Sequence, residues 1–258
     1  MRKFSFFLVL VFSNLLLFSQ INIDSITNNN AYKPGEKLVY DIRYGAIKGG
    51  EASLTIDIIP SGEDFYYYVK AKAVTTGVAT KFARIYDVYE SYFSISNGYP
   101  VKSIRNIREN NYMSYNEVLF YRNKNYVYSI NTGKHWIPKN ALDILSAFYF
   151  ARRHVFHNHL SKNQTINLPI YFEDKLYQIK LKFKEKDVIR SKFGRIECLK
   201  FVPLVDINNP FKKEDDMQIW FSDDGNFIPI KIKMKSKIGT VKAKLIGYDN
   251  LKNPLGVK

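Results

Sequence analysis

Residues 36–58 read EKLVYDIRYGAIKGGEASLTIDI, and this stretch decides the fold that the sequence predicts. Apolar side chains occupy every second position in its first half, at Leu38, Tyr40, Ile42 and Tyr44. Such alternation is typical of a half-buried strand, in which successive side chains point to opposite faces of a sheet. Glycines then interrupt the pattern, and a second alternating set follows at Ala52, Leu54, Ile56 and Ile58. The stretch therefore predicts two neighbouring antiparallel strands.

The same alternation continues along most of the chain. A third strand is expected at residues 65–75, after the turn signal Pro60-Ser61-Gly62. Further candidate strands lie near residues 84–95, 100–109, 111–121, 124–130, 165–172, 176–184, 195–204, 215–222, 227–236 and 239–248. Asn97-Gly98 is the clearest hairpin turn among them. Aromatic residues, which favour pleated surfaces, make up 16% of the chain, and the regular turn signals predict an antiparallel meander.

One segment breaks the alternation. Residues 139–160 read KNALDILSAFYFARRHVFHNHL, without Gly or Pro, and their apolar side chains fall along two helical stripes. Asn140 is a candidate N-cap, with Asp143 three residues later. We therefore expect a mainly β protein: a single antiparallel, strongly curved or rolled sheet, or partly closed barrel, with one buried helix near residues 140–159.

The first twenty residues, MRKFSFFLVLVFSNLLLFSQ, have the pattern of a cleavable export signal. Arg2 and Lys3 give a positive start, a mostly apolar run follows, and small and polar residues end it. The run is shorter than the ~20 residues that span a bilayer, and Asn14 interrupts it, which disfavours a membrane anchor. A lipoprotein signal needs a cysteine at the cut, whereas the chain's one cysteine is Cys198. We therefore expect a periplasmic or secreted protein without a lipid anchor or a transmembrane segment.

The segments of the chain follow from these patterns. We expect a signal peptide at residues 1–20, a flexible leader at 21–35, a single β-rich domain at 36–250 and a C-terminal tail at 251–258. The lone Cys198 has no intramolecular partner, and in its apolar strand we expect it to be a small buried hydrophobe.

The chain is strongly basic. Its 39 Lys and Arg against 24 Asp and Glu give a formal net charge of +15, and removing Arg2 and Lys3 leaves 37 against 24, or +13. Such a balance predicts attraction to polyanions. Outside the cytoplasm these are lipid phosphates, lipopolysaccharide or acidic glycans rather than nucleic acid. We expect a monomer without cofactor or metal, with a lipid or an anionic envelope component as its partner.

Several short segments occur in a fixed order along the chain: YKPGEKLVY at residues 32–40 with GEA at 50–52, DILSAFY at 143–149, IWFSDD at 219–224, IPI at 228–230 and IGTVKA at 238–243. In their order and spacing these segments resemble the domain of unknown function 3108 family. The resemblance covers residues 32–250. It implies an exported protein of Gram-negative bacteria, often Bacteroidota, with a rolled or partly closed antiparallel sheet, and it implies no activity, catalytic residue or cofactor.

Alternating lysines form the first candidate binding surface. If the last two strands pair through the turn at residues 236–239, one face carries Lys231, Lys233, Lys235, Lys242 and Lys244. Two interpretations stay open for this face. It binds anionic head groups, or it is a solvated outer face whose lysines also resist edge-to-edge aggregation.

The predicted helix and the first strands supply the second set of candidates. Arg152 falls on the apolar side of the helix, so it needs a carboxylate partner or an anionic ligand, and Asp143 and Glu90 are candidate partners. An apolar ligand would require a cavity, which we expect to be lined by residues such as Tyr40, Ile42, Leu54 and Phe148.

No pattern in the sequence indicates catalysis. His154, His157 and His159 lack the His-Glu-x-x-His signature of a zinc protease, and they suit the C-terminal end of a helix, where cations are favourable. Asp223-Asp224 is followed by Gly-Asn and reads as a hairpin turn rather than a catalytic pair. Ser146 has no Gly-x-Ser-x-Gly elbow around it.

The sequence thus favours a non-enzymatic binding protein for an apolar or anionic envelope ligand such as a lipid. The alternative is a structural or assembly protein of the envelope that recognises a protein or glycan through an exposed aromatic patch.

Overall fold

The computed structural model describes residues 29–62, 64–155, 160–205, 216–236 and 239–258. The expected signal peptide at 1–20, most of the expected leader, and His157 and His159 lie outside the described residues. No helix among the described residues is long and apolar enough to cross a membrane.

The described chain is built of strands with one α-helix. The strands are β1 (Glu36–Tyr44), β2 (Ile47–Ser61), β3 (Asp64–Thr75), β4 (Tyr86–Ser94), β5 (Pro100–Glu109), β6 (Tyr112–Tyr121), β7 (Tyr126–Ser129), β8 (Gly133–Trp136), β9 (Thr165–Phe172), β10 (Lys175–Ser191), β11 (Gly194–Val205), β12 (Met217–Ser222), β13 (Pro229–Ser236) and β14 (Gly239–Asp249). The helices are α1 (Ile144–Val155) and the short 3-10 turns η2 (Gly77–Lys81) and η3 (Arg122–Lys124).

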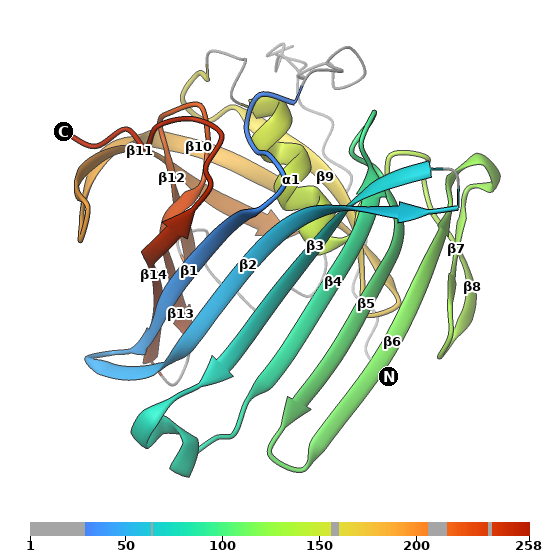
Figure 1. Cartoon of the computed structure of the whole chain (residues 1–258), viewed down its shortest axis with the longest axis horizontal. Coiled ribbons are helices and arrows are strands. Elements are labelled where there is room, and N and C mark those ends of the chain that lie inside the picture. Colours follow the sequence, from blue (N-terminus) through green and yellow to red (C-terminus); the bar gives the residue numbers. More distant parts are fainter. Residues whose placement is uncertain (1–28, 63, 156–159, 206–215, 237–238) are drawn as a thin grey trace, which may run out of the picture.

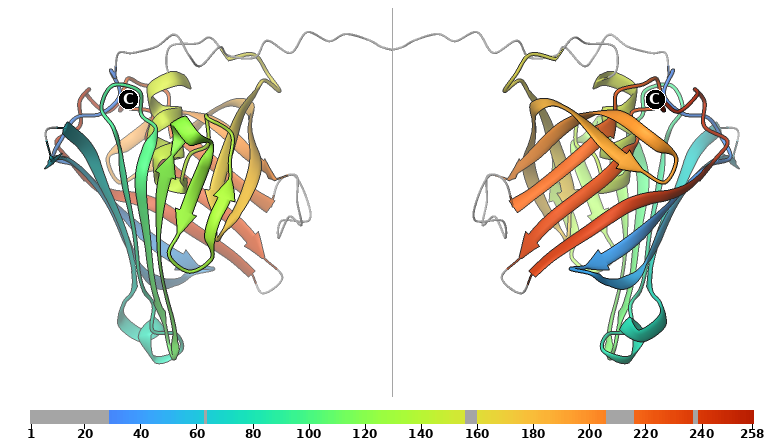
Figure 2. Two further views of the ribbon diagram at one scale, coloured as in Figure 1. Left: turned by 90° about the vertical axis from the view of Figure 1, so that its right-hand side faces the viewer. Right: turned by 90° about the vertical axis from the view of Figure 1, so that its left-hand side faces the viewer.

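All fourteen strands form one antiparallel sheet, in the order β8-β7-β6-β5-β4-β3-β2-β1-β14-β13-β12-β11-β10-β9. The sheet curls around α1, which lies inside the curl near the end opposite η2 (Figures 1 and 2). Strands β8 and β9 remain the two edges, and near the seam Leu142 makes a single parallel bridge to Ile170. The expectation of one curved antiparallel sheet with one helix is confirmed.

Most strands begin and end close to where the alternation predicts. Strand β5 matches its expected range, whereas β2 and β10 run longer at one or both ends. Both long strands carry a register shift against a neighbour, at Ile42/Arg43 opposite β2 and at Phe183/Glu185 in β10. Such bulges bend a strand without ending it. The sequence gives no sign of β8, because its four residues are too few to show alternation.

Helix α1 begins later than residue 140, and its cap is not Asn140. Asp143 Oδ1 accepts hydrogen bonds from the backbone N–H groups of Leu145 (2.9 Å) and Ser146 (3.1 Å), as an N-cap does. Residue 142 stays extended because its backbone is already paired with β9, through Leu142 N to Pro169 O at 2.9 Å and Tyr171 N to Leu142 O at 2.8 Å. The chain can turn into a helix only after this bridge.

Both sides of α1 are buried, which explains its two apolar stripes. On one side Ala147 and Phe150 pack into a core with Leu168, Phe201 and other residues of β9–β12. On the other side Tyr149 packs with Tyr32, Tyr67 and Phe93. The rings of Tyr32 and Tyr149 meet edge to face at 4.8 Å, a favourable geometry for aromatic pairs.

Both ends of the described chain lie against the sheet. Ala31 and Tyr32, in the last part of the expected leader, are 2% and 1% exposed. In the expected tail, Leu251 and Leu255 pack partly buried against the β1–β14 side of the core. Asn253 Nδ2 donates to Asn30 O at 2.8 Å, so the two ends also contact each other.

Candidate ligand-binding site on the concave face

An apolar groove of about 230 Å³ opens on the concave face of the sheet. Its floor comes from β1, β2 and β3, and α1 and β13 supply its walls. The lining residues are Tyr40, Ala52, Ser53, Leu54, Ala71, Lys72, Ala73, Tyr89, Leu145, Phe148, Pro229 and Ile232. Almost all of the surface that these residues expose to the groove is apolar. A groove of this kind favours a hydrocarbon group over water.

Small side chains create the groove. In the strand register Ala52 lies opposite Tyr40 on one side and Ala73 on the other, and Leu54 lies opposite Ala71. Alanine is depleted in strands because it packs little surface. Three alanines side by side on the inward face therefore leave a hollow beneath Leu145 and Phe148 of α1.

The groove includes three of the four residues expected to line an apolar cavity. Tyr40, Leu54 and Phe148 contribute to it, and Ile42 does not. Tyr40 is 7% exposed, and burial raises the pKa of its hydroxyl well above the usual value. Among the described residues that hydroxyl has no hydrogen-bond partner.

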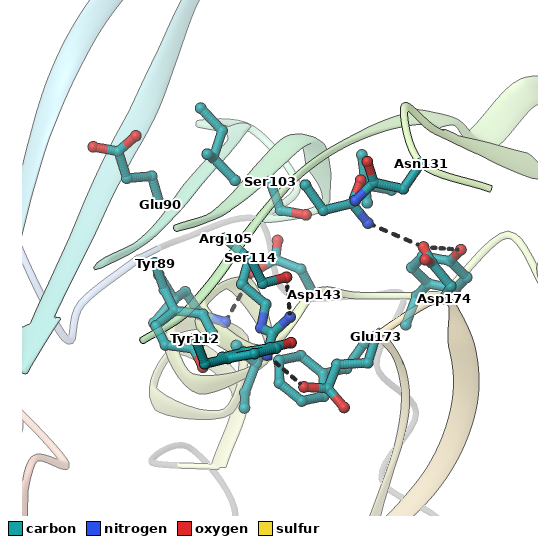
Figure 3. A pocket seen from close by; sticks show the side chains of 17 residues that line it. Tyr89, Glu90, Ser103, Arg105, Tyr112, Ser114, Asn131, Asp143, Glu173 and Asp174 are labelled. Carbon is teal, nitrogen blue, oxygen red and sulfur yellow. Dashed lines mark hydrogen bonds and ion pairs between the residues drawn. The ribbon is translucent and has the colours of Figure 1, made fainter. Parts of the chain in front are cut away.

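A second hollow, of about 220 Å³, adjoins the groove, and because its lining is about half polar we call it the polar pocket (Figure 3). Tyr89 and Leu145 line both hollows. The other residues of this polar pocket are Glu90, Ser103, Ile104, Arg105, Tyr112, Ser114, Asn116, Val118, Asn131, Asp143, Ile144, Tyr171, Phe172, Glu173 and Asp174. They come from β4, β5, β6 and β9, the β7–β8 and β9–β10 turns and the start of α1, so the pocket lies where the two edges of the curled sheet approach each other.

Arg105 is the cation of the polar pocket. Its Nη2 atom lies 2.8 Å from Glu173 Oε1, its Nη1 donates to Ser114 Oγ at 3.3 Å, and its guanidinium lies 5.9 Å from the ring centre of Phe172. Burial opposes the charged form of Arg105, but Tyr89 and Glu173 outweigh it and raise the pKa of the guanidinium. Arg105 therefore stays charged and is held in place.

Glu173 and Asp174 form the two-residue turn between β9 and β10. Both have a positive φ, 48° and 58°, which suits a tight hairpin; Asp tolerates this conformation, whereas it is strained for Glu. Asp174 Oδ1 accepts hydrogen bonds from Asn116 Nδ2 (3.1 Å) and from the Tyr171 hydroxyl (3.2 Å). Contacts across the seam, from β5 and β6, thus hold this turn at the mouth of the pocket.

Asp143 is buried at the back of the pocket. Besides capping α1, it accepts a hydrogen bond from Ser91 Oγ at 2.6 Å through Oδ2. Burial raises the pKa of this carboxyl, and the hydrogen bonds from Ser91 and the helix cap act against that shift. Because both oxygens serve the fold, Asp143 is a structural group rather than an exposed acid or base.

The lysine surface lies on the other face of the sheet. Lys231 pairs with Lys244 and Lys233 with Lys242 across β13 and β14, while Lys235 is opposite Thr240. Ile232, between two of these lysines, lines the groove, so the lysines point away from it. None of the five makes a salt bridge with a carboxylate in the described part of the chain. Burial and the neighbouring lysines lower the pKa of Lys231.

Arg152 lies in neither hollow. It is fully buried and paired with Glu36, with Nη1 and Nη2 donating to the two carboxylate oxygens at 2.6 and 2.8 Å. Its other donors reach Asn226 O at 2.9 Å and Ala31 O at 3.0 Å. The partner is thus neither Asp143 nor Glu90. Glu36 stands 116 residues before Arg152, at the start of a strand, so no local spacing in the sequence relates the two.

The remaining candidate residues, His154, Asp224 and Cys198, make contacts that serve the fold. His154 Nδ1 lies 2.7 Å from Phe150 O, and no group of three His, Cys, Asp or Glu within the described ranges could hold a metal ion. Asp224 Oδ1 accepts the backbone N–H of Asn226 at 2.8 Å, as expected for a turn. Cys198 is buried, and burial raises the pKa of its thiol to about 12.

Comparison with known proteins gives a family and a fold. The family model described as protein of unknown function (DUF3108) matches residues 39–246. A beta-barrel-like protein of the DUF1849 family from Brucella abortus has 10% identity and a TM-score of 0.58, over 85% of this chain and 99% of that one. A protein with a YmcC-like fold from Bacteroides fragilis has 8% identity and a TM-score of 0.37, over 86% and 98%. No curated protein matches the sequence.

Proposed function

We propose that the chain, which belongs to the DUF3108 family of proteins of unknown function, is an exported, non-enzymatic binding protein for a lipid-like envelope ligand. The observation that carries the proposal is the apolar groove on the concave face, between Leu54 and Ala71 of the sheet and Phe148 of α1. The ligand's hydrocarbon chain occupies this groove.

The size of the groove limits what it holds. Ligand pockets for drug-sized molecules have volumes of about 300–1,000 Å³, so a groove of about 230 Å³ suits one short length of chain rather than several acyl chains. Each methylene that leaves water contributes about 0.8 kcal/mol. Roughly five or more buried methylenes are therefore needed to reach about 4 kcal/mol, which corresponds to millimolar, readily reversible binding and suits a carrier.

Two further features support an envelope ligand. The pattern of residues 1–20 favours export to the periplasm or beyond. The lysine surface, with its two like-charged cross-strand pairs, would be attracted to anionic lipid head groups, which would bring the protein to a membrane surface.

The carboxylates near the groove support binding rather than catalysis. Asp143 caps α1, Glu173 pairs with Arg105, and Asp174 holds the β9–β10 turn. A general acid or base needs a free oxygen aimed at a reacting group. Both oxygens of the buried Asp143 are engaged with the protein, and Glu173 and Asp174 are each held in place through one oxygen.

The alternative, a structural or assembly protein, has one observation in its favour. On the face of β6–β8 that points away from α1, Tyr121, Tyr126 and Trp136 lie side by side in register. Trp136 is 71% exposed, and Lys134 lies 4.0 Å from its ring centre. Exposed aromatic patches of this kind often mark interaction sites for proteins or glycans.

The test is the binding of a small apolar fluorophore, 1-aminoanthracene, and its displacement by decan-1-ol. Ala71→Leu fills the groove, so we expect its affinity for decanol to fall at least about tenfold, because about two methylenes lose their buried place. The matched control is Thr55→Leu, next to Leu54 but on the opposite face of β2, and we expect its affinity to stay within about twofold, since it touches no groove atom. Thermal unfolding of each variant shows whether the fold is kept.

Equal affinities of the two variants would contradict a ligand in the groove. If the protein is instead a structural or assembly protein, decan-1-ol should not bind, and Trp136→Ala should abolish capture of an envelope partner.

A further inference from the structure

The two hollows share the lining residues Tyr89 and Leu145, so together they make a surface that changes from apolar to polar. In the strand register Leu54 lies opposite Ala71, Ala71 opposite Tyr89, Tyr89 opposite Arg105, and Arg105 opposite Asn116. This row crosses the concave face from β2 to β6, with Tyr89 at the boundary. A ligand whose chain lies over Leu54 and Ala71 therefore places its other end against Arg105 and Asn116.

The charges that face the polar pocket are few. Glu90 lines the pocket, but its carboxylate accepts from the Tyr68 hydroxyl at 2.5 Å and lies 3.2 Å from Lys70 Nζ, on the opposite face of the sheet. Asp143 is 3% exposed and committed to the helix cap. The groups that remain are one cation, Arg105, and two anions, Glu173 and Asp174, which leaves one net negative charge.

Resting on the proposed function, we infer that the head of the ligand is an uncharged, hydroxyl-bearing group such as a sugar. An anionic head would lie against Glu173 and Asp174, and Arg105 is already paired with Glu173 at 2.8 Å. A cationic head would be repelled by Arg105 and would compete with it for the same carboxylates. A neutral head avoids both costs, because burying an unpaired charge is expensive.

The pocket also offers what a hydroxyl-rich head needs. Glu173 and Asp174 each use one carboxylate oxygen in the contacts described above, and the second oxygens are acceptors for charge-assisted hydrogen bonds. The hydroxyls of Ser103 and Tyr112 lie at the wall of the pocket and can donate or accept (Figure 3). The rings of Tyr112 and Phe172 provide flat apolar faces for the carbon side of a sugar ring.

The test compares three amphiphiles with the same octyl chain: octyl β-glucoside, octyl sulfate and octyltrimethylammonium. Each displaces 1-aminoanthracene from the full chain at concentrations below its micelle limit. We expect octyl glucoside to bind at least about tenfold tighter than either charged amphiphile, which corresponds to about 1.4 kcal/mol.

Two variants assign this preference to the pocket. Glu173→Gln frees Arg105, so the glucoside-to-sulfate ratio should fall to about one or invert. Asp174→Asn keeps a residue that tolerates the positive φ and should weaken glucoside binding several-fold without changing displacement by decan-1-ol. Glu51→Gln, an exposed carboxylate paired with Lys48 outside the pocket, should change nothing.

The outcomes separate the two proposals. Binding of all three amphiphiles with equal affinity, or tightest binding of octyl sulfate or octyltrimethylammonium, overturns the assignment of the head and leaves the groove as the chain site. Failure of every amphiphile and of decanol to displace the fluorophore overturns the proposed function, and this inference with it.

Discussion

Removal of one partner from the buried ion pair between Glu36 and Arg152 should destabilise the fold unusually strongly. Both side chains are fully buried, and Arg152 also donates to the backbone of Ala31 and Asn226. The pair therefore joins three separate segments: the chain before β1, helix α1 and the β12–β13 turn. Glu36→Ala would leave a buried guanidinium without its counter-charge.

Breaking one partner of a buried pair costs about 3–5 kcal/mol. For a chain of this size, each kcal/mol lowers Tm by roughly 2–4 °C, so we expect a fall of roughly 6–20 °C. The assay is urea and thermal unfolding followed by tryptophan fluorescence, because Trp220 is 4% exposed in the core and reports its loss. The double variant Glu36→Leu/Arg152→Met should recover much of the loss, since it buries no lone charge.

The control is the exposed pair Lys48–Glu51, whose side chains are 46% and 40% exposed. Glu51→Ala should cost no more than about 1 kcal/mol, as surface pairs do. If Glu36→Ala costs as little as Glu51→Ala, or if the double variant is less stable than Glu36→Ala, the assignment of a charge-compensating role to Glu36 is refuted.

Three further outcomes follow from the structure. Cys198 should resist a thiol reagent at pH 8 in the native protein and react fully in urea, because burial raises its pKa to about 12; rapid native labelling would show an accessible thiol. Burial also raises the pKa of Asp143, so its carboxyl adds most stability below its unfolded pKa of about 3.9, and that contribution is lost as pH rises through the folded value. The stability advantage of the wild type over Asp143→Asn, from urea unfolding, should therefore shrink from pH 3 to pH 7, and an advantage that grows would contradict this account. Lys233→Gln should stabilise the protein by about 0.2–1 kcal/mol in low salt, by relieving repulsion from Lys242, whereas Lys235→Gln, opposite Thr240, should be neutral; the same gain in both would exclude the cross-strand cause.

Much of the fold could be predicted from local pattern. The alternation in residues 36–58 is reproduced in β1 and β2, because period-2 patterning fixes which side chains face the core. The lysine pairs were predictable too, since β13 and β14 are close neighbours in the sequence. Strand β8 was not predictable because its four residues are too few to show alternation. The bridge at Leu142 was not predictable because it depends on how the two edges of the sheet meet.

The candidate site was predictable only in part. Tyr40, Leu54 and Phe148 could be assigned to an apolar cavity because their strands and helix alternate clearly. The polar pocket could not, because Arg105 and Glu173 are far apart in sequence and meet only when the sheet curls. The one sequence signal that could have indicated the groove was the alanine at positions 52, 71 and 73, where strands ordinarily carry larger residues.

The central claim is that a hydrocarbon chain binds between the sheet and α1. The most direct measurement is photoaffinity labelling with a decanol that carries a diazirine at its chain end, followed by peptide mapping. A chain bound between the sheet and α1 should give saturable labels in the peptides containing Ala71–Ala73 and Leu145–Phe148, and these labels should be lost in Ala71→Leu. Labels concentrated on the exposed aromatic residues Tyr128 and Trp136, and unchanged in Ala71→Leu, would contradict it.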